Sequence, residues 1–156
     1  MGTFSSYLRT IIDLGRSEAS KDGSATVEAQ HLLLALAVGP DAAPRQLLAE
    51  AGLDHAAIRA ALSREFQHSL AAAGVTVDAS DLPAPSYPDE PAPHLGTSAR
   101  LALERGMDAT ARKNPRPAHL LAGILLAQVG TVPRALELVG IDRAALAERA
   151  RRAASS

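Results

Sequence analysis

The sequence predicts an all-α fold of eight helices, arranged as two four-helix repeats joined by a proline-rich linker. Hydrophobic residues make up 47% of the 156 residues, aromatic residues only 3%, and tryptophan is absent. The core must therefore be built from Leu, Ala, Ile and Val, among which alanine and leucine are the strongest helix formers. The second observation is that the chain carries one pattern twice, which predicts two copies of one structural unit.

The repeated pattern is clearest in two apolar segments that both begin with histidine. Residues 31–36 read HLLLAL and residues 119–124 read HLLAGI, an offset of 88. At this offset Gly52 matches Gly140, and no gap is needed from position 31 to position 58. Upstream of residue 31 the matching residues lie 91 positions apart, as Gly15 and Gly106 do. The copies are expected to bury their apolar faces against each other.

The repeat and the proline content define the expected organisation of the chain. Five prolines lie between residues 83 and 93, where proline fixes φ and removes backbone donors. This predicts an extended linker without regular elements. We therefore expect a single domain over residues 1–156, with the first repeat at 4–70, the linker at 71–94 and the second repeat at 95–153.

Four helices are expected in each copy, from apolar spacing and from residues typical of helix ends. An i, i+4, i+7, i+8 stripe predicts the first helix, and a short, almost wholly apolar segment predicts a buried second one. Gly52 and Gly140 suit the left-handed position after the third helix of each copy, and Asp54 and Asp142 suit the N-cap of the fourth. The expected ranges are 4–19, 28–38, 43–51 and 54–70, then 97–112 with Thr97 or Ser98 as its cap, 118–128, 133–139 and 142–153.

Charge and composition exclude several classes of function. The net charge is −1 and the pI is near 6.5, so no basic surface predicts nucleic-acid binding. Cysteine is absent, which excludes disulfides and thiolate chemistry. The longest apolar run, 32–38, is too short to span a membrane, and no signal peptide precedes it. We expect a cytoplasmic protein that contacts neither nucleic acid nor membrane.

No arrangement of residues predicts catalysis, a metal or a cofactor. His31 and His119 occupy equivalent positions, but the positions three and four residues later hold only Leu, Ala or Gly. A helical metal site would need a second ligand there. We interpret both histidines as structural groups that bond the backbone near a helix start. The sequence contains no Gly-Lys pair, which excludes a P-loop, so the chain is not predicted to be an enzyme.

The double pattern resembles the N-terminal double repeat of Clp unfoldases, the ClpA/ClpB/ClpC class of AAA+ chaperones. The resemblance covers residues 4–66 and 95–150, and it rests on the His-Leu-Leu segment and the Leu-x-x-x-Gly-Ile/Leu-Asp turn in each copy. In that family the domain is an eight-helix, pseudo-twofold module that recruits substrates and adaptors to the ATPase ring. The ring sequences are absent here. The chain is either a cut N-terminal domain or a stand-alone module, and its short Ala-Ala-Ser-Ser tail favours the latter.

Two departures from the family pattern concern phosphoarginine. ClpC-type repeats usually read Gly-Thr-Glu-His, and the Thr-Glu pair helps to form pockets for the guanidinium and phosphate groups. Here the residue before each histidine is Gln30 or Ala118. Loss of the charged acceptor predicts weak phosphoarginine binding. Glu28 either replaces the missing glutamate in part or is a first-turn acid that interacts favourably with the helix dipole. We prefer the second interpretation.

The resemblance also implies a docking surface for adaptors or cyclic peptides between the first helices of the two repeats. Arg9 and Arg100 are equivalent at the offset of 91 and have apolar neighbours. Alternatively, Ile12 and Leu103 belong to the core between the repeats. The expected groove residues are Phe4, Arg9, Ile12, Asp13, Leu95, Arg100, Leu103, Glu104 and Met107.

The leading hypothesis is a non-catalytic module that binds a protein or peptide: a Clp substrate, an adaptor or a cyclic peptide. Such a chain would act as an adaptor, as a competitor for unfoldase substrates, or as a sink for peptides that target the unfoldase. The alternative is a helical regulatory protein that binds a transcription or sigma factor.

Overall fold

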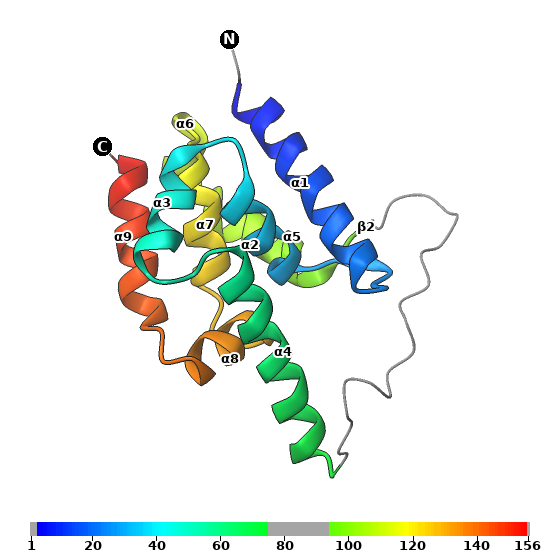
Figure 1. The fold of residues 1–156 in the computed structure, drawn as a ribbon. Coiled ribbons are helices and arrows are strands. Elements are labelled where there is room, and N and C mark those ends of the chain that lie inside the picture. The colour runs from blue at the N-terminus through cyan, green and yellow to red at the C-terminus, as the bar shows by residue number, and fades with distance from the viewer. Residues whose placement is uncertain (1–2, 75–93, 156) are drawn as a thin grey trace.

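The computed structural model describes residues 3–74 and 94–155, apart from the side chains of residues 109 and 110, and it is all-α (Figure 1). These residues form nine helices and two strands of two residues each. The helices are α1 (Phe4–Lys21), α2 (Ala29–Val38), α3 (Ala42–Glu50), α4 (His55–Ala72), α5 (Thr97–Gly106), α6 (Ala109–Lys113), α7 (Pro117–Leu125), α8 (Thr131–Leu138) and α9 (Arg143–Ser155).

The ninth helix arises because the segment expected as one helix over 97–112 is broken. α5 ends at Gly106, Met107 leaves the helical region with φ −102° and ψ 54°, and α6 begins after Asp108. The Asp108 carboxylate accepts the Ala111 N–H at 2.9 Å and so caps the new helix. The apolar spacing continues across this break, so periodicity alone did not reveal it.

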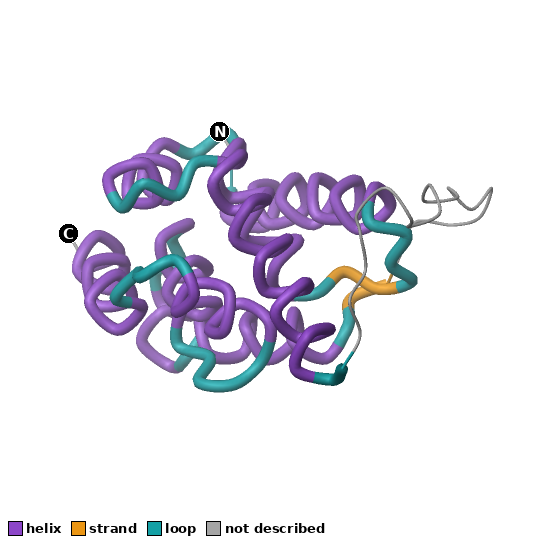
Figure 2. The backbone as a smooth tube through the Cα atoms, turned by 60° about the horizontal axis from the view of Figure 1, so that its bottom comes forward, coloured by secondary structure: helices purple, strands orange, loops and turns teal. Residues whose placement is uncertain are grey.

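Two further sequence predictions were wrong at element ends. Neither Thr97 nor Ser98 caps α5, because its N-cap residue is Gly96. The linker expected at 71–94 is shorter at both ends, since α4 continues to Ala72 and His94 begins β2 (His94–Leu95). The rest of that prediction, residues 75–93, lies outside the described residues. β2 pairs in parallel with β1 (Thr26–Val27), a small bridge at the edge of the helical body (Figure 2).

Helices α2 and α7, which begin near the two histidines, form the centre of the molecule. Nearly every residue of both is buried, as their apolar sequences predict. α1 packs on α2, while α5 and α9 pack on α7. The approach of α5 to α7 depends on Gly123, where an added Cβ would lie 2.2 Å from the Ala102 carbonyl oxygen. Any other residue at position 123 would push the two helices apart.

Several local geometries recur at the offset of 88. His31 Nδ1 accepts the Glu28 N–H at 2.9 Å, and His119 Nδ1 accepts the Arg116 N–H at 3.0 Å. The backbone bonds predicted for both histidines are therefore confirmed. The predicted glycine ends and aspartate caps are also confirmed: Gly52 and Gly140 have φ of +76° and +75°, and Asp54 and Asp142 accept N–H groups three residues later at 2.8 and 3.0 Å.

Candidate interaction surface

The outward face of α1 carries a shallow hollow, which we call the α1 hollow. It is lined by Ser5, Leu8, Arg9, Ile12, Asp13 and Arg16. Leu8 and Ile12 are half-buried and pack against the core, so they supply an apolar floor. Arg9 and Asp13 are exposed, and Asp13 pairs with Arg16 at 3.0 Å. The hollow thus offers apolar contact between charges of both signs, as the surface of a transient protein interface does.

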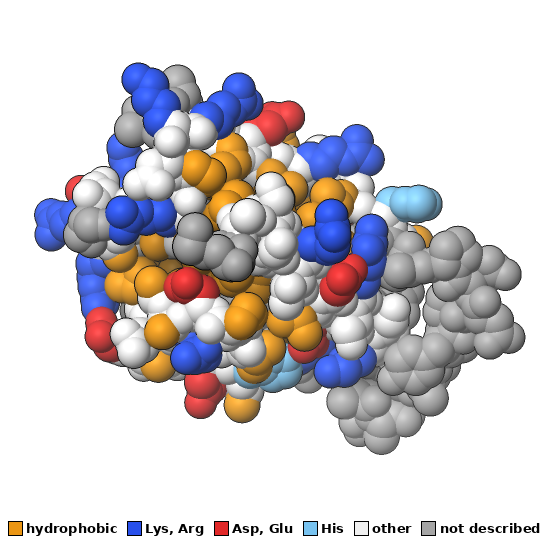
Figure 3. Space-filling view, turned by 90° about the horizontal axis from the view of Figure 1, so that it is seen from above, with side chains coloured by type: hydrophobic (Ala, Val, Ile, Leu, Met, Phe, Trp, Pro, Cys, Tyr) orange, Lys and Arg blue, Asp and Glu red, His pale blue; other side chains and the backbone are white. Residues whose placement is uncertain are grey.

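A second hollow lies at the start of α1, against the loops before α3 and α7. Its lining includes Phe4, Tyr7, Pro40, Asp41, Pro115 and Pro117. The Phe4 and Tyr7 rings are 6.2 Å apart between centroids and tilted by 41°. Apolar side chains gather between charged groups on this face of the molecule (Figure 3). We call this the aromatic hollow.

Tyr7 is a site residue that sequence reasoning missed. Its hydroxyl is buried and has no hydrogen-bond partner among the described residues. Burial raises the pKa of Tyr7, and the nearby Asp41 carboxylate raises it further. The spacing of three residues between Phe4 and Tyr7 was the signal, because it places both rings on one face of the helix.

The expected groove residues of the second repeat lie on β2 and α5. Arg100 donates two hydrogen bonds to the Leu95 carbonyl oxygen, at 3.2 and 3.1 Å, and so ties the strand to the helix. Leu95 and Leu103 are half-buried against the core. Glu104 is exposed, and Met107 is half-buried at the end of α5.

The structure separates the expected groove residues on α1, which line the two hollows, from those on β2 and α5, which line neither. Arg9, Ile12 and Asp13 share the α1 hollow, while Phe4 lines the aromatic hollow. Neither hollow contains a residue of β2 or α5. The expected groove residues that line a hollow therefore all come from α1. A partner that also contacted α5 would have to extend beyond both hollows.

The positions expected for phosphoarginine-type pockets have different surroundings. Gln30 is half-buried, whereas Ala118 is only 2% exposed. The Glu28 carboxylate accepts the Ser98 hydroxyl at 2.7 Å, the Ser98 N–H at 3.3 Å and the Thr26 hydroxyl. Burial raises the pKa of Glu28, but these hydrogen bonds outweigh it and hold the pKa below the usual range. Glu28 is thus already engaged by protein groups.

A charged cluster between α1, α2 and α4 was also missed from the sequence. Glu18, 5% exposed, accepts hydrogen bonds from His55 at 2.7 Å and from Arg59. Arg59 also donates to Asp22 at 2.6 Å, and Asp22 lies 3.0 Å from His31 Nε2. Burial raises the pKa of Glu18 and of Asp22, but their histidine and arginine partners outweigh it and lower both. Glu18 on α1 and Asp22 just after it are four residues apart, as are His55 and Arg59 on α4. This spacing was the available signal in the sequence.

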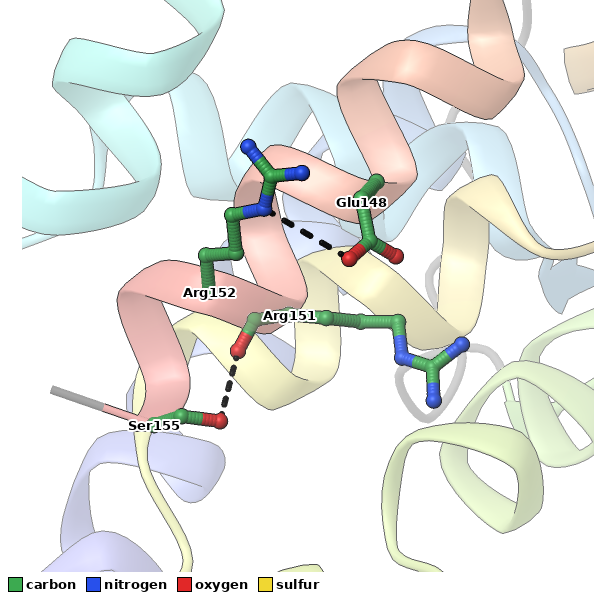
Figure 4. Close-up of a pocket in the computed structure, with 4 residues that line it drawn as sticks. All are labelled: Glu148, Arg151, Arg152 and Ser155. Atoms are coloured by element: carbon green, nitrogen blue, oxygen red, sulfur yellow. Dashed lines mark hydrogen bonds and ion pairs between the residues drawn. The ribbon is translucent and has the colours of Figure 1, made fainter.

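The described residues contain no group of three or more His, Cys, Asp or Glu side chains placed to hold a metal ion. Among them, no helix has both the length and the apolar character needed to cross a membrane. A further hollow on α9 is lined by Glu148, Arg151, Arg152 and Ser155 (Figure 4). All four belong to one helix, and Arg152 lies 3.6 Å from Glu148.

A family model described as the Clp repeat (R) N-terminal domain matches residues 3–83, which are 81 of the 156 residues. No curated protein matches the chain.

Proposed function

Because the chain belongs to the Clp repeat N-terminal domain family, we propose that it binds a peptide segment of a partner protein along α1. The family membership makes the chain a Clp-type protein-interaction module. The α1 hollow is the observation that supports the location. There, half-buried Leu8 and Ile12 lie among the charges of Arg9, Asp13 and Arg16.

The chemistry of α1 defines the kind of segment that fits. An apolar side chain of the partner would cover Leu8 and Ile12, and charged neighbours would meet Arg9 and Asp13. The Phe4 and Tyr7 rings offer a second apolar contact from the same helix. Aromatic side chains are enriched among the residues that dominate binding energy at protein interfaces.

Within this proposal the 156 residues bind a partner without using a nucleotide. The sequence holds no Gly-Lys pair and so no P-loop. A module that binds what the unfoldase binds would act as an adaptor, as a competitor for its substrates, or as a sink for peptides directed at it. In all three roles the chain would use the same contact on α1. The roles differ in which protein or peptide is bound there.

Binding of a labelled unfolded protein, such as fluorescent casein, to the purified chain tests the location. Arg9→Glu should weaken binding at least about tenfold, or 1.4 kcal/mol. Arg64→Glu is the matched control, because Arg64 is an exposed arginine on α4, outside both hollows. Equal affinity of both variants for the labelled protein would exclude α1 as the binding face.

A further inference from the structure

A small pocket lies where α7 meets the ends of α5 and α9, and it shares no lining residue with the two hollows at α1. Its volume is about 230 Å³. The floor is apolar and comes from Ala122 of α7, Leu126 just after α7, and Ala111 of α6. The polar lining comes from three parts of the chain: Arg105 and Asp108 around the α5–α6 turn, His119 on α7, and Arg151 with Ser155 on α9.

His119 lines this pocket and carries a hydrogen-bond donor that the described residues leave unused. Its Nδ1 accepts the Arg116 N–H at 3.0 Å, so in the neutral ring the proton resides on Nε2. No described residue bonds that Nε2. Burial lowers the pKa of His119, and Arg116 acts in the same direction against the opposing effect of Asp108. The imidazole is therefore neutral at pH 7, with its N–H available.

The equivalent histidine of the first copy has no such freedom. His31 is 2% exposed, and its Nε2 lies 3.0 Å from the Asp22 carboxylate. At the offset of 91, the counterpart of Asp22 is Lys113, an exposed residue at the end of α6. In the first copy a carboxylate thus bonds the histidine, whereas in the second copy Asp108 acts on His119 through its charge, with no hydrogen bond to Nε2 among the described residues.

Two guanidinium groups line the same pocket. Arg105 and Arg151 are both exposed, and no described residue accepts a hydrogen bond from either side chain. The Arg151 side chain extends away from the Glu148–Arg152 pair on its own helix (Figure 4). Asp108 is the single acid in the lining, and one of its oxygens already caps α6. The pocket therefore carries an excess of positive charge and of donors.

We propose that this pocket binds a carboxylate attached to a small apolar group, as found at the C-terminal residue of a peptide or in a free carboxylic acid. The carboxylate would accept from Arg105, Arg151 and His119 Nε2, and arginine favours such paired contacts. The apolar group would rest on Ala122 and Leu126. The volume is below the roughly 300–1,000 Å³ of drug-sized sites, so only an end group fits. Phosphate fits less well, because it leaves the apolar floor uncovered and Asp108 opposes its higher charge.

N-acetyl-L-alanine is a suitable probe, with N-acetyl-L-alaninamide as the uncharged match. Titration of the full chain with the acid should shift the NMR signals of the His119 ring saturably, and the amide should not. Arg151→Gln should weaken binding about tenfold, equal to 1.4 kcal/mol. Arg152→Gln, the next residue on α9 and outside this pocket, should leave the affinity unchanged. Arg105→Gln tests the second guanidinium in the same way.

A tripeptide ending in alanine distinguishes the two sources of the carboxylate. Affinity at least about tenfold above that of N-acetyl-L-alanine indicates a peptide C-terminus, and equal affinity indicates a free acid. The carboxylate site is wrong if the His119 signals do not saturate, if the amide binds equally, if phosphate binds more tightly, or if Arg151→Gln and Arg152→Gln behave alike. Arg9→Glu should not alter carboxylate binding. The test of the carboxylate pocket is therefore independent of the test of the α1 surface.

Discussion

Glu28 and Ser98 cap each other's helices although they lie 70 residues apart. The Ser98 hydroxyl accepts the Ala29 N–H of α2 at 2.8 Å and donates to the Glu28 carboxylate at 2.7 Å. The same carboxylate accepts the Ser98 N–H in the first turn of α5. Gly96 makes room for it, because an added Cβ there would lie 2.0 Å from a Glu28 oxygen. The starts of α2 and α5 are thus joined by one pair of side chains.

The first prediction is that these two side chains stabilise the fold as a unit. Ser98→Ala and Glu28→Ala should each cost about 1–2 kcal/mol of unfolding free energy, since each removes a helix cap. The double variant should cost less than the sum by more than about 0.5 kcal/mol, because the residues share their bonds. Urea denaturation gives all three values. Ser63→Ala, an exposed change on α4, is the control. Strict additivity would show that the mutual cap carries no coupling energy.

The second prediction concerns acid. The pKa values of Glu18, Asp22 and Glu28 are lowered in the folded state. Their contribution to stability is therefore complete above the unfolded pKa values, near 4, and is lost as pH falls through the lower folded values. Thermal melts from pH 7 to pH 3 should show a falling melting temperature below about pH 5.

Arg59 links two of these acids, so its removal should change the same profile. Arg59→Gln leaves Glu18 and Asp22 without their shared cation. Arg59 is half-buried, so loss of its charge-assisted hydrogen bonds should cost about 1.5–3 kcal/mol at pH 7 and should flatten the acid dependence. Arg64→Gln, exposed on the same helix, should do neither. An unchanged acid profile in Arg59→Gln would mean that the cluster does not set the pH dependence.

The third prediction separates Arg9 from Arg100, the two arginines that match at the offset of 91. Arg9→Glu should change stability by no more than about 0.5 kcal/mol, because the side chain is exposed. Arg100→Glu should cost about 1 kcal/mol, because it removes the bonds to the Leu95 carbonyl. If a partner contacts both, the double variant should lose about 2 kcal/mol or more of binding energy. Thermal melts and partner-binding measurements on the same samples test both effects. Unchanged partner binding by the double variant would show that Arg9 and Arg100 lie outside the interface.

The fourth prediction ranks three apolar residues. Ile11 is wholly buried, whereas Ile12 and Leu103 are half-buried against the core. Ile11→Ala should cost about 3–5 kcal/mol, and Ile12→Ala or Leu103→Ala about 2 kcal/mol, because less apolar area is lost. Denaturant midpoints measure the order. If Ile12→Ala left stability unchanged but weakened partner binding, Ile12 would serve the interface alone.

The fifth prediction concerns phosphoarginine. We expect binding at least about tenfold weaker than in a domain with glutamate before both histidines, which is 1.4 kcal/mol. Gln30→Glu should recover part of it, because position 30 is half-buried. Ala118→Glu should instead destabilise the fold, because that position is 2% exposed and would bury an unpaired charge. Calorimetry with free phosphoarginine, alongside thermal melts, tests both changes.

The sequence by itself determined the helical class and the position of most helices. The capping aspartates at 54 and 142, the left-handed glycines at 52 and 140 and the histidine bonds at 31 and 119 all followed from local chemistry. Such features involve neighbours within a few residues, so spacing and residue type are sufficient to predict them. The surface residues on α1 were predicted from the family resemblance, and their role stays a prediction.

Only the tertiary structure decided which distant groups meet. Ser98 was expected to cap its own helix and instead caps α2, because β1 and β2 bring the two helix starts together. α5 ends at Gly106, where an added Cβ would lie 2.6 Å from the His119 carbonyl oxygen. The pairing of Glu18 with Arg59 likewise depends on how α1 and α4 lie in space. Contacts between residues tens of positions apart leave no period in the sequence, so packing alone determines them.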